Sequence, residues 1–336
     1  MWLKWFPWRF LVRSAARRKG FLDPIKIISQ LQNFSQPSEV IAPNELLRSG
    51  VVLHARGLIN SLAIQHNLDW IWPYWVECQY NPRNEAFIPR SFSLTQINLT
   101  HRNWTALGVP DSNEFSIVDP RGLVTPCYDG WSLDAWIIPV EGDPLIPSRL
   151  AEVSQKLVMD QGLCVETESR RNQLRLHTKV QMIGSAQSPV CQIRVEGFSD
   201  RAAWLVISLR PYNPEGVSFI HDIALIENRM GWQVNRKDVV YFNSPPERYE
   251  FSYYYHGDVY RRLPIRQVNL LDRQVNLPIR QAGLLAEEAG RSLPEDKKEI
   301  WCRVGMASAA ALYALEAGQT REITMTVPLT RSRPLS

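Results

Sequence analysis

The sequence predicts a mainly β protein, a large two-sheet antiparallel sandwich with helices before it. From residue 91 onward, apolar and polar residues alternate in several short runs, as in strands with one buried and one solvated face. Turn residues separate these runs at short intervals, which favours antiparallel pairing over a parallel α/β sheet. The length of 336 residues is compatible with one large sandwich.

The strands are predicted from the period of the apolar residues. Alternation is clearest over 174–182 and 191–196, where apolar residues are separated by charged or amide side chains. Residues 203–209 form a continuous apolar run, which indicates a central strand covered on both faces. Further strands are predicted at 220–226, 232–235, 239–242, 249–255 and 323–329, with turns at 119–122, 129–130, 213–216 and 245–246 between them.

The chain is expected to have four parts. Residues 1–22 form a basic aromatic segment and 23–67 a helical preface. Helices are predicted at 24–34 and 43–66, and a break near Asn67 ends the second of them. The sandwich domain is expected over 68–330, followed by a tail at 331–336. Within it, 263–299 is predicted to be an insertion-like loop, because Leu-Pro-Ile-Arg-Gln occurs at both 263–267 and 277–281.

Composition excludes several functional classes. Apolar residues make up 45% of the chain, which argues against disorder, and a net charge of +4 without a clustered basic face argues against nucleic-acid binding. The five cysteines include no Cys-x-x-Cys pair, which predicts reduced thiols and a cytoplasmic protein. No apolar run is long enough to span a bilayer.

The N-terminal segment has two interpretations. It could lie at a membrane surface, with aromatics at the headgroup boundary and cations on anionic lipid, or it could pack as a helix on protein. The packed helix is favoured because aromatics this dense usually become buried. The membrane-contact candidates are Trp2, Trp5, Trp8, Arg13, Arg17 and Arg18.

Residues 68–80 are unusually rich in aromatics. Trp70, Trp72 and Trp75 could stack on sugar rings, with Asp69 or Glu77 accepting hydroxyl hydrogen bonds. The alternative, which is favoured, is a core cluster or an interface loop. Pro73 excludes a regular helix interior at this point.

No known catalytic motif is present. Glycoside hydrolysis needs two carboxylates flanking the bond, and no spacing selects a pair among Asp69, Glu77, Asp129, Asp134, Glu215 and Asp222. There is no Gly-x-Ser-x-Gly elbow and no phosphate-binding loop, and the histidines are scattered. We therefore predict no metal and no cofactor.

Three polar-aromatic segments remain, at 119–136, 208–216 and 253–259. Loops of this composition carry binding groups on sandwiches, but Asn, Asp, Pro and Gly are also what tight turns require. The remaining carbohydrate-contact candidates are Asp129, Trp131, Trp136, Arg210 and Glu215.

The segment 119–136, the loop Arg210-Pro-Tyr-Asn-Pro-Glu-Gly and the closing run 305–329 resemble the N-terminal domain of bacterial glycogen-debranching, amylo-α-1,6-glucosidase-like glycosidases. The resemblance implies a β-supersandwich that precedes a six-hairpin α/α-barrel. In that family the barrel holds the catalytic carboxylates. Only 330–336 follow the closing run here, so no catalytic residue is carried over.

The functional expectation is a non-catalytic glycosidase domain. It would support or shape an α-glucan site on a separate or missing α/α-barrel domain or subunit. Two alternatives stay open: a free-standing carbohydrate-binding protein, and a peripheral membrane protein anchored by residues 1–19. A self-contained enzyme is the least favoured possibility.

Overall fold

The structure is a computed structural model that describes residues 59–60, 63–64, 67, 69–80, 104–159, 162–214, 216–264 and 298–329. Contacts divide the chain into two units, residues 1–62 with 90–96, and residues 63–89 with 97–336. Residues 59–60 of the first unit are helical, and all other described residues belong to the second unit. The predicted helix at 24–34, the N-terminal segment, most of the 263–299 loop and the tail lie outside the described residues.

The second unit is mainly β, as predicted. Its strands are β1 (Thr105–Gly108), β2 (Phe115–Val118), β3 (Val124–Thr125), β4 (Ser132–Pro139), β5 (Ser154–Met159), β6 (Leu163–Arg171), β7 (Leu174–Ser185), β8 (Ser188–Phe198), β9 (Ala203–Arg210), β10 (Tyr212–Asn213), β11 (Gly216–Val217), β12 (Asp222–Leu225), β13 (Gly231–Val234), β14 (Asp238–Phe242), β15 (Arg248–Ser252), β16 (Glu299–Trp301), β17 (Ser308–Leu315) and β18 (Thr320–Pro328). The helical elements are α4 (Tyr74–Tyr80) and the 3₁₀ turns η2 (Pro147–Arg149), η3 (Glu227–Arg229), η4 (Tyr254–His256) and η5 (Val259–Arg262).

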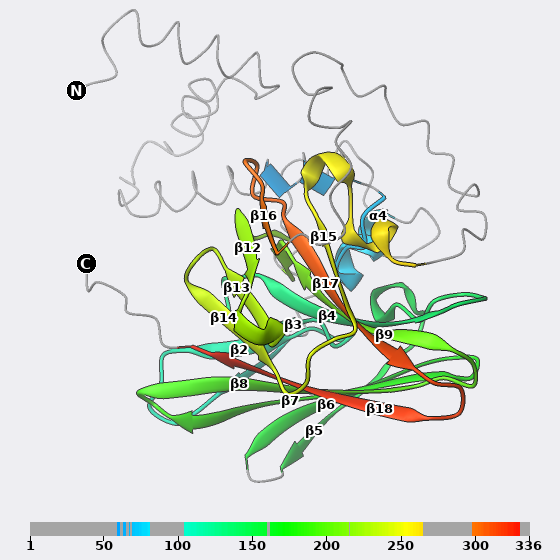
Figure 1. The fold of residues 1–336 in the computed structure, drawn as a ribbon. Coiled ribbons are helices and arrows are strands. Elements are labelled where there is room, and N and C mark those ends of the chain that lie inside the picture. The colour runs from blue at the N-terminus through cyan, green and yellow to red at the C-terminus, as the bar shows by residue number, and fades with distance from the viewer. Residues whose placement is uncertain are drawn as a thin grey trace, which may run out of the picture. The chain divides into compact units, whose positions relative to one another are not determined.

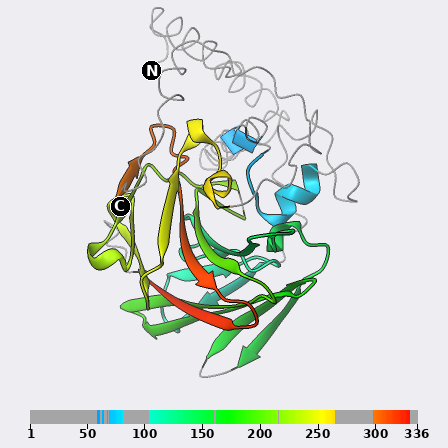
Figure 2. The same cartoon turned by 45° about the vertical axis from the view of Figure 1, so that its right-hand side comes forward.

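Two antiparallel sheets form the sandwich (Figures 1 and 2). The first has seven strands in the order β1-β2-β3-β4-β9-β17-β15, and the second has nine in the order β16-β12-β13-β14-β18-β8-β7-β6-β5. Apolar side chains from both sheets meet in one buried cluster. Gly197 of β8 lies so close to Leu205 of β9 that an added Cβ would be 3.0 Å from a leucine methyl carbon, which shows how tightly the sheets pack.

The two sheets differ in how their outer faces are covered. In the nine-stranded sheet, β7 and β8 alternate between buried and exposed residues, so their outer face is solvated. In the seven-stranded sheet, every residue of β4 is buried, and all but one of β9. The prediction that residues 203–209 form a doubly covered central strand is therefore confirmed.

The outer face of the seven-stranded sheet has its own apolar cover. Side chains from β4, β9 and β17 pack there in a second cluster with Ile71, Ile146, Val259, Tyr260 and Leu263. The covering segments are therefore 69–72, the η2 turn and the η5 turn. These elements come from three separate parts of the chain and form a third layer over the sandwich.

Several sequence-based boundaries are corrected. The segment 119–136 is not one loop, because it contains β3 and the first residues of β4. Its polar residues Ser132 and Asp134 are compatible with a buried strand because they pair with the polar Arg210 and Ser208 of β9. The strand predicted at 249–255 ends at Ser252 and continues as a 3₁₀ turn. The strands β1, β2, β5 and β6 were not predicted.

The described helix boundaries before the sandwich lie where the local sequence predicts them. Residues 63–64 are helical, and Asn67 ends this stretch by donating from its side chain to the Ala63 carbonyl at 2.7 Å. Pro73 directly precedes α4, and its carbonyl accepts the N–H groups of Val76 and Glu77. The exclusion of Pro73 from a helix interior is thus confirmed, and the same proline starts the next helix.

The turn between β2 and β3 depends on a buried carboxylate. Asp119 Oδ1 accepts the N–H groups of Arg121 at 2.8 Å and Leu123 at 2.9 Å, and Gly122 has a φ of +85°. Burial raises the pKa of Asp119 to about 7, because desolvation outweighs the two backbone hydrogen bonds. The folded protein therefore binds a proton at pH values where the unfolded chain has already released it.

We predict that Asp119→Asn removes a pH-dependent destabilisation. Between about pH 4 and pH 7 the unfolded aspartate is ionised while the folded one is still protonated, so wild-type stability falls with rising pH. The asparagine carbonyl keeps both backbone hydrogen bonds and does not titrate. The difference in unfolding free energy, variant minus wild type, should rise by about 1.4 kcal/mol per pH unit from pH 5 to 7. Urea unfolding at pH 5, 6, 7 and 8 measures this difference, and a value independent of pH would contradict the prediction.

Candidate functional site

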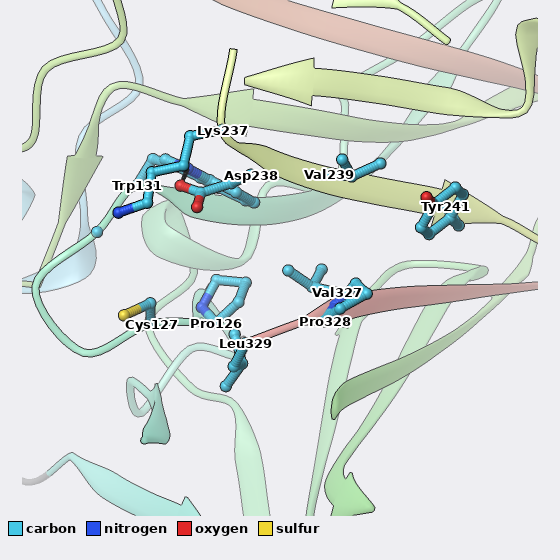
Figure 3. A pocket seen from close by; sticks show the side chains of 11 residues that line it. Pro126, Cys127, Trp131, Lys237, Asp238, Val239, Tyr241, Val327, Pro328 and Leu329 are labelled. Carbon is cyan, nitrogen blue, oxygen red and sulfur yellow. Dashed lines mark hydrogen bonds between the residues drawn. The ribbon is translucent and has the colours of Figure 1, made fainter. Parts of the chain in front are cut away.

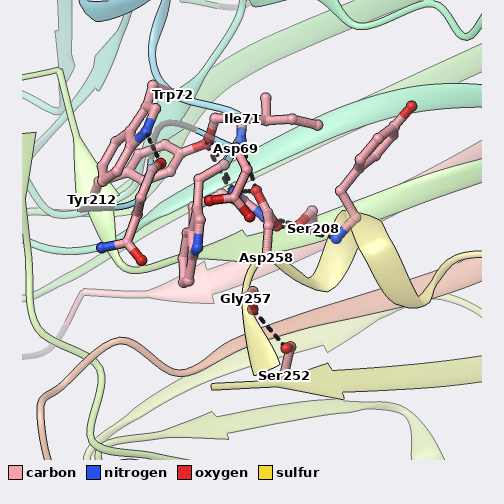
Figure 4. A network of polar contacts seen from close by, with 12 residues as sticks. Asp69, Ile71, Trp72, Ser208, Tyr212, Ser252, Gly257 and Asp258 are labelled. Atoms are coloured by element: carbon pink, nitrogen blue, oxygen red, sulfur yellow. Dashed lines mark hydrogen bonds and ion pairs between the residues drawn. The ribbon is translucent and has the colours of Figure 1, made fainter. Parts of the chain in front are cut away.

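A buried ion pair lies on the outer face of the seven-stranded sheet (Figure 4). Arg210, the last residue of β9, donates from Nη1 to Asp258 Oδ1 at 2.6 Å and from Nη2 to Asp258 Oδ2. Both side chains are 0% exposed. Asp258 also caps η5 by accepting the N–H of Tyr260 at 3.0 Å. The pair therefore joins the end of the central strand to the turn that covers it.

The ion pair holds the backbone of Ile71 from both sides. Asp258 Oδ2 accepts the Ile71 N–H at 2.7 Å, and the Ile71 carbonyl accepts from Arg210 Nη2 at 3.0 Å. The Tyr212 hydroxyl donates to the same carbonyl at 2.6 Å and accepts from Arg210 Nε at 2.9 Å. We call Arg210, Tyr212 and Asp258 the clasp, because together they fix the aromatic segment to the sheet.

Aromatic rings surround the guanidinium of the clasp. The Arg210 Cζ lies 5.1 Å from the ring centre of Trp136 and 5.7 Å from that of Trp70, within the range of cation–π attraction. Trp72 stacks on Trp70 at 6.1 Å and donates from its indole to the Asn67 carbonyl at 2.8 Å. All three tryptophans are buried, so in this structure their faces are occupied by protein.

Burial and neighbouring charges shift the pKa values of the ionisable groups at the clasp. Burial alone lowers the pKa of Arg210, but the carboxylate of Asp258 more than reverses this and holds the pKa above its ordinary value. Asp134 lies on the same face of the sheet. Burial raises its pKa to about 6, against the opposing effects of the Trp136 indole and the Arg210 charge. The guanidinium is thus permanently charged and most strongly coupled to Asp258.

The clasp has the chemistry of a structural lock. Both carboxylate oxygens of Asp258 are engaged by the guanidinium and by backbone N–H groups, so neither is available to a substrate. Removing the charges of Arg210 and Asp258 from water costs free energy, and this cost is offset only while all of their hydrogen-bond partners are present. Of the candidates named from sequence, Arg210 is a member of the clasp, and Trp70, Trp72 and Trp136 pack around it.

A cavity of about 300 Å³ lies at a different place, between β14 and the end of β18 (Figure 3). Its polar lining comes from Lys237, Asp238 and Tyr241, and Trp131 forms part of the wall. The Trp131 indole N–H donates to Asp238 Oδ2 at 3.1 Å. The apolar lining is Pro126, Val239, Val327, Pro328 and Leu329, with Cys127 and Gly130 completing it.

The predicted contact residues are thus divided between places. Trp131 is the candidate that reaches the cavity, while Asp129 is exposed in the neighbouring turn. Trp75 is partly buried and packs against the main core. Glu215 and the membrane-contact candidates Trp2, Trp5, Trp8, Arg13, Arg17 and Arg18 lie outside the described residues, and all of these roles remain predictions.

Sequence reasoning missed the partners that complete both sites. Tyr212 and Asp258 fall within two of the three polar-aromatic segments, so their neighbourhood was identified but not their pairing. Asp238 and Tyr241 had no signal of their own, since they sit on an ordinary strand. Fold geometry alone brings Asp238 beside Trp131 and places Tyr241 on the lining of the same cavity.

Other site types are not seen in the described part of the chain. There, no group of three His, Cys, Asp or Glu side chains could hold a metal ion. The five cysteines all fall within the described ranges and form no disulfide. Among the described helices, none combines the length and the apolar character needed to traverse a bilayer.

Comparison with solved structures finds partial overlaps of fold. No family model matches the chain, and no curated protein matches it. A bacterial glucoamylase solved in complex with acarbose overlaps 64% of this chain and 30% of its own, with 9% identity and a TM-score of 0.40. A protein from the human microbiome named as a kojibiose phosphorylase overlaps 57% of this chain and 21% of its own, with 14% identity and a TM-score of 0.29.

This chain spans less than a third of the length of either solved structure. At these scores the overlaps do not establish membership of a family.

We predict that Asp258→Asn destabilises the fold by about 3–5 kcal/mol, because it leaves the Arg210 guanidinium buried without a counter-charge. The matched control is Glu168→Gln. It removes the partner of Arg170 from a solvent-exposed pair on β6 and should cost no more than about 1 kcal/mol. Chemical unfolding of both variants measures the difference. Equal losses of unfolding free energy in the two variants would show that the clasp does not hold the fold together more strongly than a surface ion pair.

Proposed function

We propose that this chain is a non-catalytic β-sandwich domain of glycogen-debranching type, formed by residues 68–330. In this proposal it supports or shapes an α-glucan site on a separate α/α-barrel domain or subunit. The observation that carries the proposal is where the acidic side chains lie. Among the described residues, both carboxylate oxygens of Asp258 are hydrogen-bonded within the clasp, and Asp238 is the one carboxylate that lines the cavity. A pair flanking a glycosidic bond would be needed for hydrolysis.

An exposed apolar strip supports the proposed role beside a partner. Trp301 on the edge strand β16 is 61% exposed, and Phe219 and Val304 are exposed near it. Phe219 packs on Gly305, and the Cys302 N–H donates to the His221 carbonyl at 2.7 Å, so segments 219–222 and 301–305 run side by side. Large exposed apolar side chains that gather on neighbouring segments are typical of surfaces covered by another protein. We assign this strip to the barrel contact.

Carbohydrate binding by the chain on its own is a second candidate function. The cavity beside Trp131 favours it, because an aromatic wall, a carboxylate, an ammonium group and a phenol converge there. The two functions are compatible, since the strip and the cavity involve different residues.

The proposal predicts that the purified chain does not hydrolyse branched or linear α-glucans. Co-expression with an α/α-barrel glycosidase domain encoded in the same genome should give a stable complex. Trp301→Ser should weaken that complex at least tenfold, because it removes the largest exposed apolar side chain of the strip. Co-purification and sedimentation measure the complex.

Leu157→Ser is the matched control, since Leu157 is 59% exposed on β5 at the opposite edge of the same sheet. The control should leave the complex intact. Glucan hydrolysis by the isolated chain that one carboxylate substitution abolishes would overturn the proposal. So would equal effects of the two variants.

A further inference from the structure

The cavity exists because two neighbouring strands separate. β14 and β18 pair only at Tyr241 with Thr326 and at Phe242 with Met325. The next hydrogen-bonded pair in this register would join Val239 to Pro328. Proline has no N–H, so the ladder ends there and β18 continues along β8 alone. The cavity occupies the resulting gap (Figure 3).

The gap leaves a backbone edge facing the cavity. The Phe242 N–H donates to the Met230 carbonyl on the β13 side. Because backbone groups alternate in direction along an antiparallel strand, those of Tyr241 and Val239 face the β18 side. Tyr241 pairs with Thr326, whereas Val239 is outside the ladder with β18. The backbone N–H and C=O of Val239 therefore supply one donor and one acceptor to the cavity.

Side chains of both charges stand near this edge. The turn at Asn235 and Arg236, both with φ near +55°, places Lys237 and Asp238 at the start of β14. Asp238 is oriented by the Trp131 indole, and Tyr241 lies at the other end of the cavity (Figure 3). A strongly anionic ligand would meet the Asp238 carboxylate, and a cationic one would meet the Lys237 ammonium. A neutral ligand that both donates and accepts hydrogen bonds fits both.

The size and the apolar lining narrow the ligand further. A volume of about 300 Å³ corresponds to about ten water molecules at about 30 Å³ each, which is enough room for one hexose ring. Pro328 and Val239 give an apolar surface against which the C–H face of such a ring can lie. Its hydroxyls would reach Asp238, Lys237 and the backbone of Val239.

We propose that the gap between β14 and β18 is a binding site for one neutral hexose unit of a saccharide. Pro328 keeps this site open by withholding the backbone donor that would close the ladder. The inference rests on the proposed function only for the choice of a glucose-based probe. Since it concerns residues away from the exposed apolar strip, it can fail while the barrel contact stands, and the reverse also holds.

Calorimetric titration of the full chain with maltotriose tests the proposal. We expect saturable binding at millimolar concentration, the weak affinity typical of a site for one sugar ring. Pro328→Ala supplies the N–H that can donate to the Val239 carbonyl, so it should close the gap, weaken binding at least tenfold and leave the melting temperature unchanged or raised. Asp238→Ala should weaken binding to a similar degree. Glu322→Ala, an exposed carboxylate on β18 outside the cavity, should not change it.

Each possible binding result either supports or overturns the proposed site. Binding of maltotriose that both cavity variants lose and the Glu322 variant keeps supports the site. Absence of binding to the wild-type chain up to about 50 mM, well beyond the millimolar range, overturns it. Binding that Pro328→Ala leaves unchanged also overturns it, because in the proposal Pro328 keeps the gap open. Binding of a short extended peptide in place of the sugar overturns it in favour of strand addition.

Discussion

The ion pair between Arg210 and Asp258 is the interaction on which the outer layer of this protein depends. Its two members are 48 residues apart, and the backbone they grip at Ile71 is 139 and 187 residues away from them. No local preference could bring these three segments together. A buried charge without its partner costs several kcal/mol, whereas the complete set of hydrogen bonds roughly offsets that cost. The clasp therefore specifies one arrangement of the covering segments and penalises any other.

This arrangement explains the unequal character of the two sheets. The nine-stranded sheet buries one face and leaves the other in water, so β7, β8 and β18 alternate. The seven-stranded sheet is covered twice, once by its partner sheet and once by the segments that the clasp holds. Its central strands consequently have no wet face. Ile71 and Trp136 belong to this second cover, whereas Trp70 and Trp72 are buried in the main core. Packing within the protein therefore accounts for the density of tryptophans without any ligand.

The cavity has the opposite physical origin. It is produced by a hydrogen bond that Pro328 cannot make. One missing N–H in an otherwise regular ladder separates two strands and turns a backbone edge toward solvent. The side chains of the clasp are fully hydrogen-bonded, whereas at the gap one backbone pair is left incomplete. Trp131 belongs both to the main core, in which it is buried, and to the wall of the cavity.

The fold class and the strands with one solvated face were predictable from the pattern of residues along the chain. The alternation over 174–182 and 191–196 reflects one dry and one wet side, and it is readable because the environment repeats every second residue. The apolar run at 203–209 was readable as a doubly covered strand for the same reason.

The burial of polar residues and the identity of their partners depend on contacts between segments that are far apart in the chain. Ser132 and Asp134 resembled a loop because their partners, Arg210 and Ser208, come from a strand more than seventy residues later. The short strands β1 and β2 and the edge strand β5 were equally hidden, since partial burial gives no clear period. The pairings of Arg210 with Asp258 and of Trp131 with Asp238 are long-range contacts, and no residue pattern along the chain encodes them.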